Sequence, residues 1–276
     1  MSESTQVRPV ATTSGAKELA AEAASELRFR TGADGYDAAV VLGSGWTEAA
    51  DSLGIPNIDI DMSDLPGFAP PSAAGHSSKV RSLWVGAKRV VVFLGRTHLY
   101  ETHDPMRVAH AVRTAVSAGA STVVLTGAAG SLRADFAVGQ PILVRDHINL
   151  TARSPLAGPD FVDLSGAYSR RLRGITRDID GSLAEGVYAS LLGPQLQTPA
   201  ELAMLRSAGA DLVGRSIALE TIAAVEMGAE VLGMAMVSND AMGAVFEPFD
   251  SAKALAVVQQ RALRLGDLLH AILVRT

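Results

Sequence analysis

The chain has 276 residues, 48% of them hydrophobic, enough to bury the core of one large α/β domain or two small ones. A formal net charge of −5, with 24 lysines and arginines spread along the chain, argues against a nucleic-acid-binding surface. The absence of cysteine excludes disulfides and thiol nucleophiles and is typical of a cytoplasmic protein. The 6 histidines contain no His-x-x-x-His pair, so we expect no metal site.

One domain is expected, because no Pro/Ser-rich linker or run of charge interrupts the chain. Residues 1–15 are polar and without periodicity, which predicts a disordered tail ahead of a single domain over residues 16–276. The tail lacks the apolar core of a signal peptide, and the apolar runs elsewhere are shorter than the roughly 20 residues that span a bilayer. We therefore expect no membrane partner.

Helical and strand patterns alternate along the chain. In chain order we expect a helix over residues 16–30, strands over 37–42 and 90–94, a helix over 105–117, strands over 122–125, 141–144, 186–192 and 231–237, and a helix from residue 251 to the end. Thr198-Pro199-Ala200-Glu201 is a typical helix start, and Gly119, Gly209 and Gly228 are typical of positions just past helix ends. The alternation predicts an α/β fold with a central mixed β-sheet flanked by helices.

The strongest functional signal lies where apolar strands end. Gly95-Arg96-Thr97-His98-Leu99-Tyr100-Glu101 crowds an arginine, a histidine and a tyrosine at one strand exit. Gly43-Ser44-Gly45 follows another strand and leaves backbone N–H groups open beside a hydroxyl. Thr126-Gly127-Ala128-Ala129-Gly130-Ser131 follows a third strand and is also predicted to be a small-residue turn. Since strand ends share one edge of an open sheet, these segments predict a single site for an anion such as phosphate.

Other interpretations of these residues are open. Arg96 and His98 could form a structural ion pair with Glu101, and Ser44 could cap a helix. A nicotinamide site is not expected, because Gly43-Ser44-Gly45 is not followed by the third glycine of the dinucleotide-binding pattern.

Short blocks in a fixed order along the chain carry a family resemblance. They are Val40-Val41-Leu42-Gly43-Ser44-Gly45, Pro66-Gly67-Phe68, Ala74-Gly75-His76, residues 95–101, Ala128-Ala129-Gly130, Asp146-His147-Ile148-Asn149-Leu150, Glu185-Gly186-Val187-Tyr188, Thr198-Pro199-Ala200-Glu201 and residues 209–214. Together they are similar to the trimeric purine nucleoside phosphorylases, of the nucleoside phosphorylase-I fold, from about Asp37 onward. The resemblance implies a homotrimer that needs no cofactor beyond inorganic phosphate as co-substrate.

The resemblance also implies roles for individual residues. Phosphate-binding positions are Ser44, Arg96, His98, the backbone at Ala128, and Ser216. Nucleoside-binding positions are Tyr100, Gln197, Arg215, Ser238, Asn239 and, lent by one subunit to its neighbour, Phe161. The catalytic positions are His76, which closes over phosphate and sugar, His98, and Asn239, which contacts the purine O6/N7 edge.

Departures from the family pattern are concentrated at the nucleoside-binding positions. Gln197 replaces the base-binding glutamate, Leu196 an aromatic residue, Arg215 a methionine under the sugar, and Ser251 a histidine that contacts the 5′-hydroxyl. The resemblance therefore implies a pentosyltransferase of purine salvage that phosphorolyses purine ribonucleosides or deoxyribonucleosides to free base and sugar 1-phosphate, with an altered base preference. A phosphorylase of a 5′-modified or other nucleoside, and a non-catalytic homologue that binds phosphate or a nucleotide, are the alternatives.

Overall fold

The computed structural model describes residues 12–69, 71–73, 75–241 and 249–276. The helices are α1 (Thr13–Thr31), η1 (Thr47–Ala49), α2 (Ala50–Leu53), η2 (Met62–Asp64), α3 (Leu99–Thr102), α4 (Pro105–Val108), α5 (His110–Ser117), α6 (Arg170–Ile179), α7 (Pro199–Ser207), α8 (Ala218–Glu226), α9 (Ser251–Gln259) and α10 (Ala262–Arg275). The strands are β1 (Ala38–Val41), β2 (Ile55–Asp61), β3 (Lys79–Val85), β4 (Lys88–Phe93), β5 (Thr122–Ser131), β6 (Pro141–Asn149), β7 (Ala184–Ser190), β8 (Leu212–Gly214) and β9 (Glu230–Asp240).

The strands form one mixed sheet in the order β2-β3-β4-β1-β5-β8-β7-β6-β9. β1 lies between β4 and β5 and is parallel to both, whereas β3 is antiparallel to β2 and β4. β9 also pairs with β5, so β5, β8, β7, β6 and β9 close into a ring. The mixed sheet flanked by helices confirms the predicted fold class.

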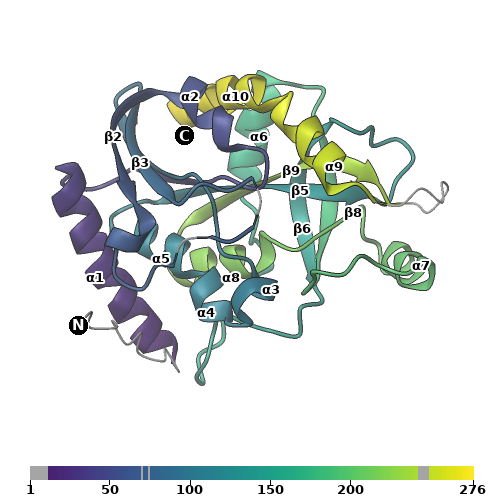
Figure 1. Cartoon of the computed structure of the whole chain (residues 1–276), viewed down its shortest axis with the longest axis horizontal. Coiled ribbons are helices and arrows are strands. Elements are labelled where there is room, and N and C mark those ends of the chain that lie inside the picture. Colours follow the sequence, from purple (N-terminus) through teal and green to yellow (C-terminus); the bar gives the residue numbers. More distant parts are fainter. Residues whose placement is uncertain (1–11, 70, 74, 242–248) are drawn as a thin grey trace.

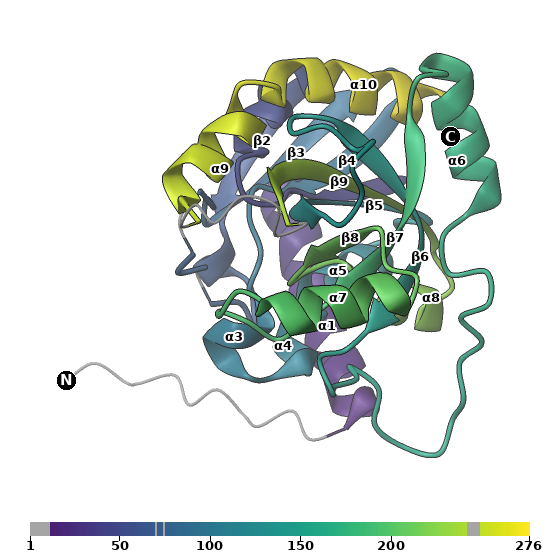
Figure 2. The same ribbon diagram turned by 90° about the vertical axis from the view of Figure 1, so that its right-hand side faces the viewer.

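Helices cover both faces of the sheet (Figures 1 and 2): α2, α6, α9 and α10 lie on one face, and α1, α5 and α8 lie on the other. In β1, Ala39 and Val41 pack with the α1 and α5 side, while Ala38 and Val40 pack with the α2 and α10 side. All of β1 is therefore buried, as expected for a parallel strand that is covered on both faces. No helix among the described residues is long and apolar enough to cross a membrane.

The predicted strands are present, but some boundaries were wrong. β5 does not end at Leu125 but continues to Ser131, because its backbone stays paired with β9. The segment Thr126–Ser131 is thus the second half of a strand and not a turn, with a register shift between Ala129 and Gly130 that marks a bulge. β6 likewise runs on to Asn149. The edge strand β2 was not predicted, because its residues are mostly exposed and form no apolar run.

The helix predictions also need correction at their ends. α1 begins at Thr13 and not at residue 16, because the Thr12 side chain caps it by accepting from the Gly15 N–H. Residues 13–15 are therefore helical, and residues 1–11 of the predicted tail lie outside the described residues.

Two predicted helices are each divided in the structure. Residues 105–117 form α4 and α5, which meet at Ala109, and the last predicted helix forms α9 and α10. The helix start at Thr198 is confirmed as a capping box with Glu201. The three predicted glycine stops are also confirmed, since Gly119, Gly209 and Gly228 all have positive φ.

Candidate active site

The predicted anion site lies where β1, β4 and β5 come together. Val41 at the end of β1 is in register with Phe93 of β4 on one side and with Leu125 of β5 on the other. Ser44 follows β1, Arg96 follows β4, and the half-buried Ala128 lies in β5 just beyond this register point. The structure therefore brings the three segments to one edge of the sheet, as parallel neighbours require.

The guanidinium of Arg96 is buried and held from several directions. Its Nη2 donates to the Val41 carbonyl at 2.8 Å and to the Thr126 carbonyl at 2.6 Å, and its Nη1 donates to Glu220 at 3.0 Å. The ion pair of Arg96 is therefore with Glu220, and not with Glu101 as the alternative interpretation of the sequence expected. The buried Nε of Arg96 has no hydrogen-bond partner among the described residues, so this N–H is available to a ligand.

His76 and Ser44 form the second part of the site. His76 Nδ1 accepts from the Arg96 backbone N–H at 3.1 Å, which places the ring proton on Nε2, and Nε2 then donates to Ser44 Oγ at 2.9 Å. Burial, with His98 and Arg96 nearby, lowers the pKa of His76 to about 3, so the ring is neutral at pH 7. The Ser44 hydroxyl accepts from His76 and keeps its own hydrogen for an anion.

His98 and Tyr100 form the third part. His98 Nδ1 donates to the Glu101 carboxylate at 2.9 Å, and the ring stacks on Tyr100 with centroids 4.9 Å apart. Burial would raise the pKa of Glu101, but hydrogen bonds from His98 and Ser72 outweigh it and lower the pKa, so the carboxylate stays ionised. The predicted contact with Glu101 is present, but it occupies only one ring nitrogen and leaves Nε2 of His98 for a ligand.

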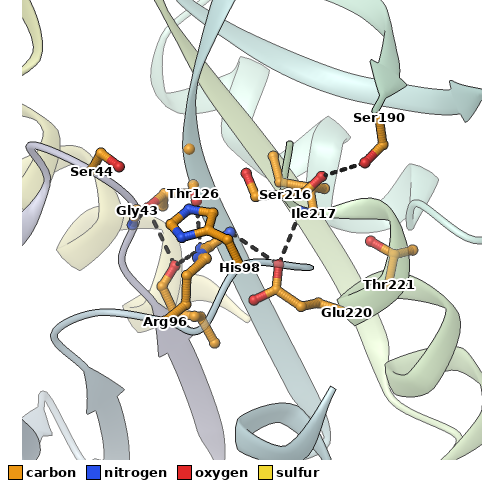
Figure 3. Close-up of polar contacts among 12 residues, drawn as sticks. Gly43, Ser44, Arg96, His98, Thr126, Ser190, Ser216, Ile217, Glu220 and Thr221 are labelled. Atoms are coloured by element: carbon orange, nitrogen blue, oxygen red, sulfur yellow. Dashed lines mark hydrogen bonds and ion pairs between the residues drawn. The ribbon is translucent and has the colours of Figure 1, made fainter. Parts of the chain in front are cut away.

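Ser216 lies in a strained turn between β8 and α8. Ile217 has φ +72° and ψ −55°, and the Ala218 N–H donates to the Ser216 carbonyl at 2.9 Å, which closes a γ-turn. For a β-branched residue this conformation costs on the order of 1–3 kcal/mol. A Cβ added to Gly127 would lie 3.0 Å from Ser216 Oγ, so the serine sits against β5 beside Ala128. Figure 3 shows Arg96 and His98 between Ser44 and Ser216.

The nucleoside-binding residues predicted from the sequence form a looser group. Nη2 of Arg215 donates to the Gln195 carbonyl at 2.8 Å and to Gln197 Oε1 at 3.4 Å, while its Nε has no partner. Burial lowers the pKa of Arg215. A Cβ added to Gly193 would lie 3.0 Å from Arg215 Cγ and 3.2 Å from Tyr100 Cδ1. Gln197, Arg215 and Tyr100 therefore lie side by side.

The other predicted positions are more widely spread. Ser238 Oγ donates to Asn239 Oδ1 at 2.9 Å, and Asn239 Nδ2 donates to the Asp240 carbonyl at 3.4 Å. Asn239 pairs with Gly130 of β5, so its remaining Nδ2 hydrogen lies beside the strand that carries Ala128. Phe161 is fully exposed, and no contact among the described residues joins it to the rest of the site.

Ser251 stands apart from the other predicted positions. Ser251 is the exposed first residue of α9, and its neighbours Glu247 and Pro248 lie outside the described residues, as does Ala74. No cluster of histidine and acidic side chains with the geometry of a metal site was found in the described part of the chain.

The sequence analysis missed several residues that build the site. Glu220 pairs with Arg96, Thr126 accepts from the Gly43 N–H at 3.0 Å, and the Tyr188 hydroxyl accepts from the Ser216 N–H at 3.3 Å. A signal for Glu220 existed, because an acidic residue in the first turn after a small polar segment is typical of a helix start. Thr126 lies in one of the predicted site segments, but its contact with Gly43 was not predicted, and Tyr188 lies inside a strand and carried no local signal.

Comparison with known proteins places the chain in a family. Residues 37–274 match the model of the Phosphorylase superfamily, and the chain belongs to this superfamily, which confirms the predicted family. A protein named purine nucleoside phosphorylase from Mycobacterium tuberculosis is 54% identical, over 94% of this chain and 96% of the relative. The one from Cellulomonas sp is 46% identical, over 91% of both chains. The solved structure of Schistosoma mansoni purine nucleoside phosphorylase in complex with inosine superposes with a TM-score of 0.85 at 26% identity, covering 94% of this chain and 96% of that one.

Proposed function

We propose that this protein phosphorolyses purine nucleosides. Inorganic phosphate adds to C1′ of the sugar, the N-glycosidic bond breaks, and free purine and ribose or deoxyribose 1-phosphate leave. The observation that carries the proposal is a pair of donors at one sheet edge, the unpartnered Arg96 Nε and the Ser44 hydroxyl, in a chain 54% identical to a protein of this name. A solved neighbour that holds inosine supports a purine nucleoside as substrate.

The site is suited to this reaction because the transition state needs charge stabilisation and positioning. The sugar becomes oxocarbenium-like, so the enzyme need only hold phosphate against C1′ and stabilise the departing purine. Ser44, Arg96, His98 and Ser216 are proposed to hold phosphate. The remaining Nδ2 hydrogen of Asn239 is proposed to donate to the O6/N7 edge, where negative charge builds on the base. One such donor is worth about 10²–10³ in rate.

The base preference is proposed to differ from that of an enzyme with glutamate at position 197. Because Arg215 can only donate hydrogen bonds, the atom of Gln197 that faces it is the carbonyl oxygen, which leaves the amide hydrogens for the base. A glutamate would accept hydrogen bonds from N1–H and from the 2-amino group of guanine. An amide N–H is itself a donor and can accept from neither group. We therefore expect guanosine to be disfavoured relative to inosine, and a base with an acceptor at N1 to be tolerated.

A second candidate substrate is a nucleoside that carries an added group on its sugar. Arg215 indicates that the added group on the sugar is acidic, because this half-buried cation has no carboxylate partner among the described residues. A buried charge without a partner is costly, and an anionic substituent on the substrate would neutralise it.

The proposed assembly is a homotrimer acting in purine salvage in the cytoplasm, with phosphate as co-substrate and no cofactor. Phe161 supports shared sites, since a fully exposed phenylalanine is suited to covering a neighbour's pocket. Mixing an Arg96→Met variant with a Phe161→Ala variant should restore activity through hybrid trimers. A stable, active monomer in sedimentation would contradict the assembly.

A nucleoside panel with and without phosphate tests the function. Inosine, guanosine, adenosine, 5′-modified nucleosides and nucleoside 5′-phosphates would be incubated with the protein, with free base measured by chromatography and sugar 1-phosphate by ³¹P NMR. Phosphate-dependent release of purine is expected. Activity restricted to sugar-modified substrates supports the second candidate, and no release from any nucleoside supports a non-catalytic binding protein.

A further inference from the structure

One buried carboxylate joins two parts of the proposed phosphate site. Glu220 lies in the first turn of α8, and its side chain is 1% exposed. Its Oε2 accepts from Arg96 Nη1 at 3.0 Å and also from the Ile217 N–H at 2.9 Å (Figure 3). The same oxygen therefore holds the cation that follows β4 and the turn that follows β8.

The turn depends on this contact. The left-handed backbone of Ile217 is unfavourable for a β-branched residue, and such a conformation persists only where its surroundings fix it. Ile217 is fully buried, so its N–H would be an unpaired buried donor without Glu220. The conformation of Ile217 in turn sets the direction of the neighbouring Ser216 N–H and hydroxyl.

Arg96 depends on the same carboxylate. The carbonyls of Val41 and Thr126 hold Nη2, and Glu220 accepts one hydrogen of Nη1, so the plane of the guanidinium is fixed. Nε–H and the second Nη1 hydrogen are then left for a ligand. A planar guanidinium with both outer nitrogens held has one direction in which Nε–H can point.

We propose that Glu220 is a positioning residue for inorganic phosphate, acting through Arg96 and the Ser216 turn. The proposal rests on the proposed function in one respect, that phosphate is the anion bound at this edge. The negative charge of Glu220 by itself would repel phosphate. If Glu220 acts through its charge alone, removal of that charge should strengthen phosphate binding. If Glu220 positions Arg96 and the Ser216 turn, its removal should weaken phosphate binding, so the two roles can be told apart.

The test is Glu220→Gln, which keeps the size of the side chain and removes its charge. The single carbonyl oxygen of an amide can take the place of Oε2, but both hydrogen bonds then lose their charge assistance and the ion pair with Arg96 is lost. We expect the KM for phosphate to rise by about tenfold or more, with the KM for inosine within about twofold of wild type. A purely structural role would lower thermal stability without separating the two KM values.

Glu226→Gln is the matched control. Glu226 lies in the same helix, its side chain is 8% exposed, and it faces Lys17 and Arg113, away from the site. This variant should lose thermal stability but keep the wild-type KM for phosphate.

A second variant keeps the proposal testable if Glu220→Gln does not fold. Glu220→Asp retains the charge but is one methylene shorter, so it cannot reach both donors, and phosphate binding should again weaken by about tenfold. Binding of inorganic phosphate would also be measured by calorimetry in the absence of nucleoside, so that the result stands even if no nucleoside is turned over. Phosphate binding that is unchanged or tighter in Glu220→Gln, or unchanged in Glu220→Asp, would overturn the proposal.

Discussion

The two ends of the candidate site are built differently. At the proposed phosphate end, Arg96 joins segments 55 and 124 residues away in the chain through Val41 and Glu220, and its contacts are buried. At the nucleoside end, Arg215 contacts Gln195 and Gln197 near the surface, and Ser238 bonds its neighbour Asn239. A buried network in which most groups are committed tolerates little change, whereas loop contacts can be exchanged without loss of the fold. If the proposed function holds, the phosphate end should therefore fix the reaction class, and the nucleoside end should set the substrate.

The largest effect is expected from Arg96→Met. It removes a proposed phosphate donor and leaves Glu220 as an unpaired buried charge, which costs about 3–5 kcal/mol of stability. Chemical denaturation and phosphate-dependent turnover would both be measured, and both should fall.

Arg113→Met is the matched control for burial. Arg113 is also fully buried and donates to the Pro155 carbonyl at 2.7 Å, but it lies outside the proposed site. Its replacement should destabilise the protein and leave the KM for phosphate unchanged. If Arg96→Met also leaves that KM unchanged, the phosphate end has been misplaced.

A smaller effect is expected from Gln197→Glu at the nucleoside end. Exchange of a neutral for a charged hydrogen bond is worth roughly 1–2 kcal/mol, or about tenfold in kcat/KM, and should favour guanosine over inosine. Because the new carboxylate would also pair with Arg215, the variant should be measured alone and together with Arg215→Met. Gln195→Glu, at an exposed position of the same loop, is the control. An unchanged guanosine-to-inosine ratio would mean that residue 197 does not read the base.

Part of the difference between the two ends of the site could be predicted from the sequence. The apolar strands ending in Gly43 and Gly95 indicated where Ser44, Arg96 and His98 would lie, because both patterns are local. The length of β5 was missed, since its second half is defined by pairing with β9, which periodicity does not report. Glu220 was missed as a partner because it lies 124 residues from Arg96. Nothing in a β-branched residue such as Ile217 predicts a positive φ.

The smallest effect on activity and stability at neutral pH is expected from His110→Gln, at the start of α5. Burial lowers the pKa of His110 from 6.5 to about 4, so between these values the unfolded chain binds a proton that the folded chain does not. Stability must therefore fall as the pH falls through this window, by about 1.4 kcal/mol per pH unit for one group. Glutamine can still donate to the Pro66 carbonyl, as Nε2 does at 2.8 Å.

Denaturation of the His110→Gln variant at several pH values between about 4.5 and 6 checks this, and its slope of stability against pH should be shallower than that of wild type by about 1.4 kcal/mol per unit. Phosphate-dependent turnover at pH 7 should not change. An equal slope in both proteins would show that His110 does not remain neutral in the folded state.

The most direct test that the two ends of the site are independent is a calorimetric measurement of inorganic phosphate binding without nucleoside, in wild type and in Gln197→Leu. The phosphate end is held by contacts within the folded chain and Gln197 takes no part in them, so both proteins should bind phosphate with Kd values within about twofold, while the KM for inosine rises in the variant. Failure of the wild type to bind phosphate without nucleoside, or a large change in phosphate Kd in Gln197→Leu, would contradict the separation of the two ends.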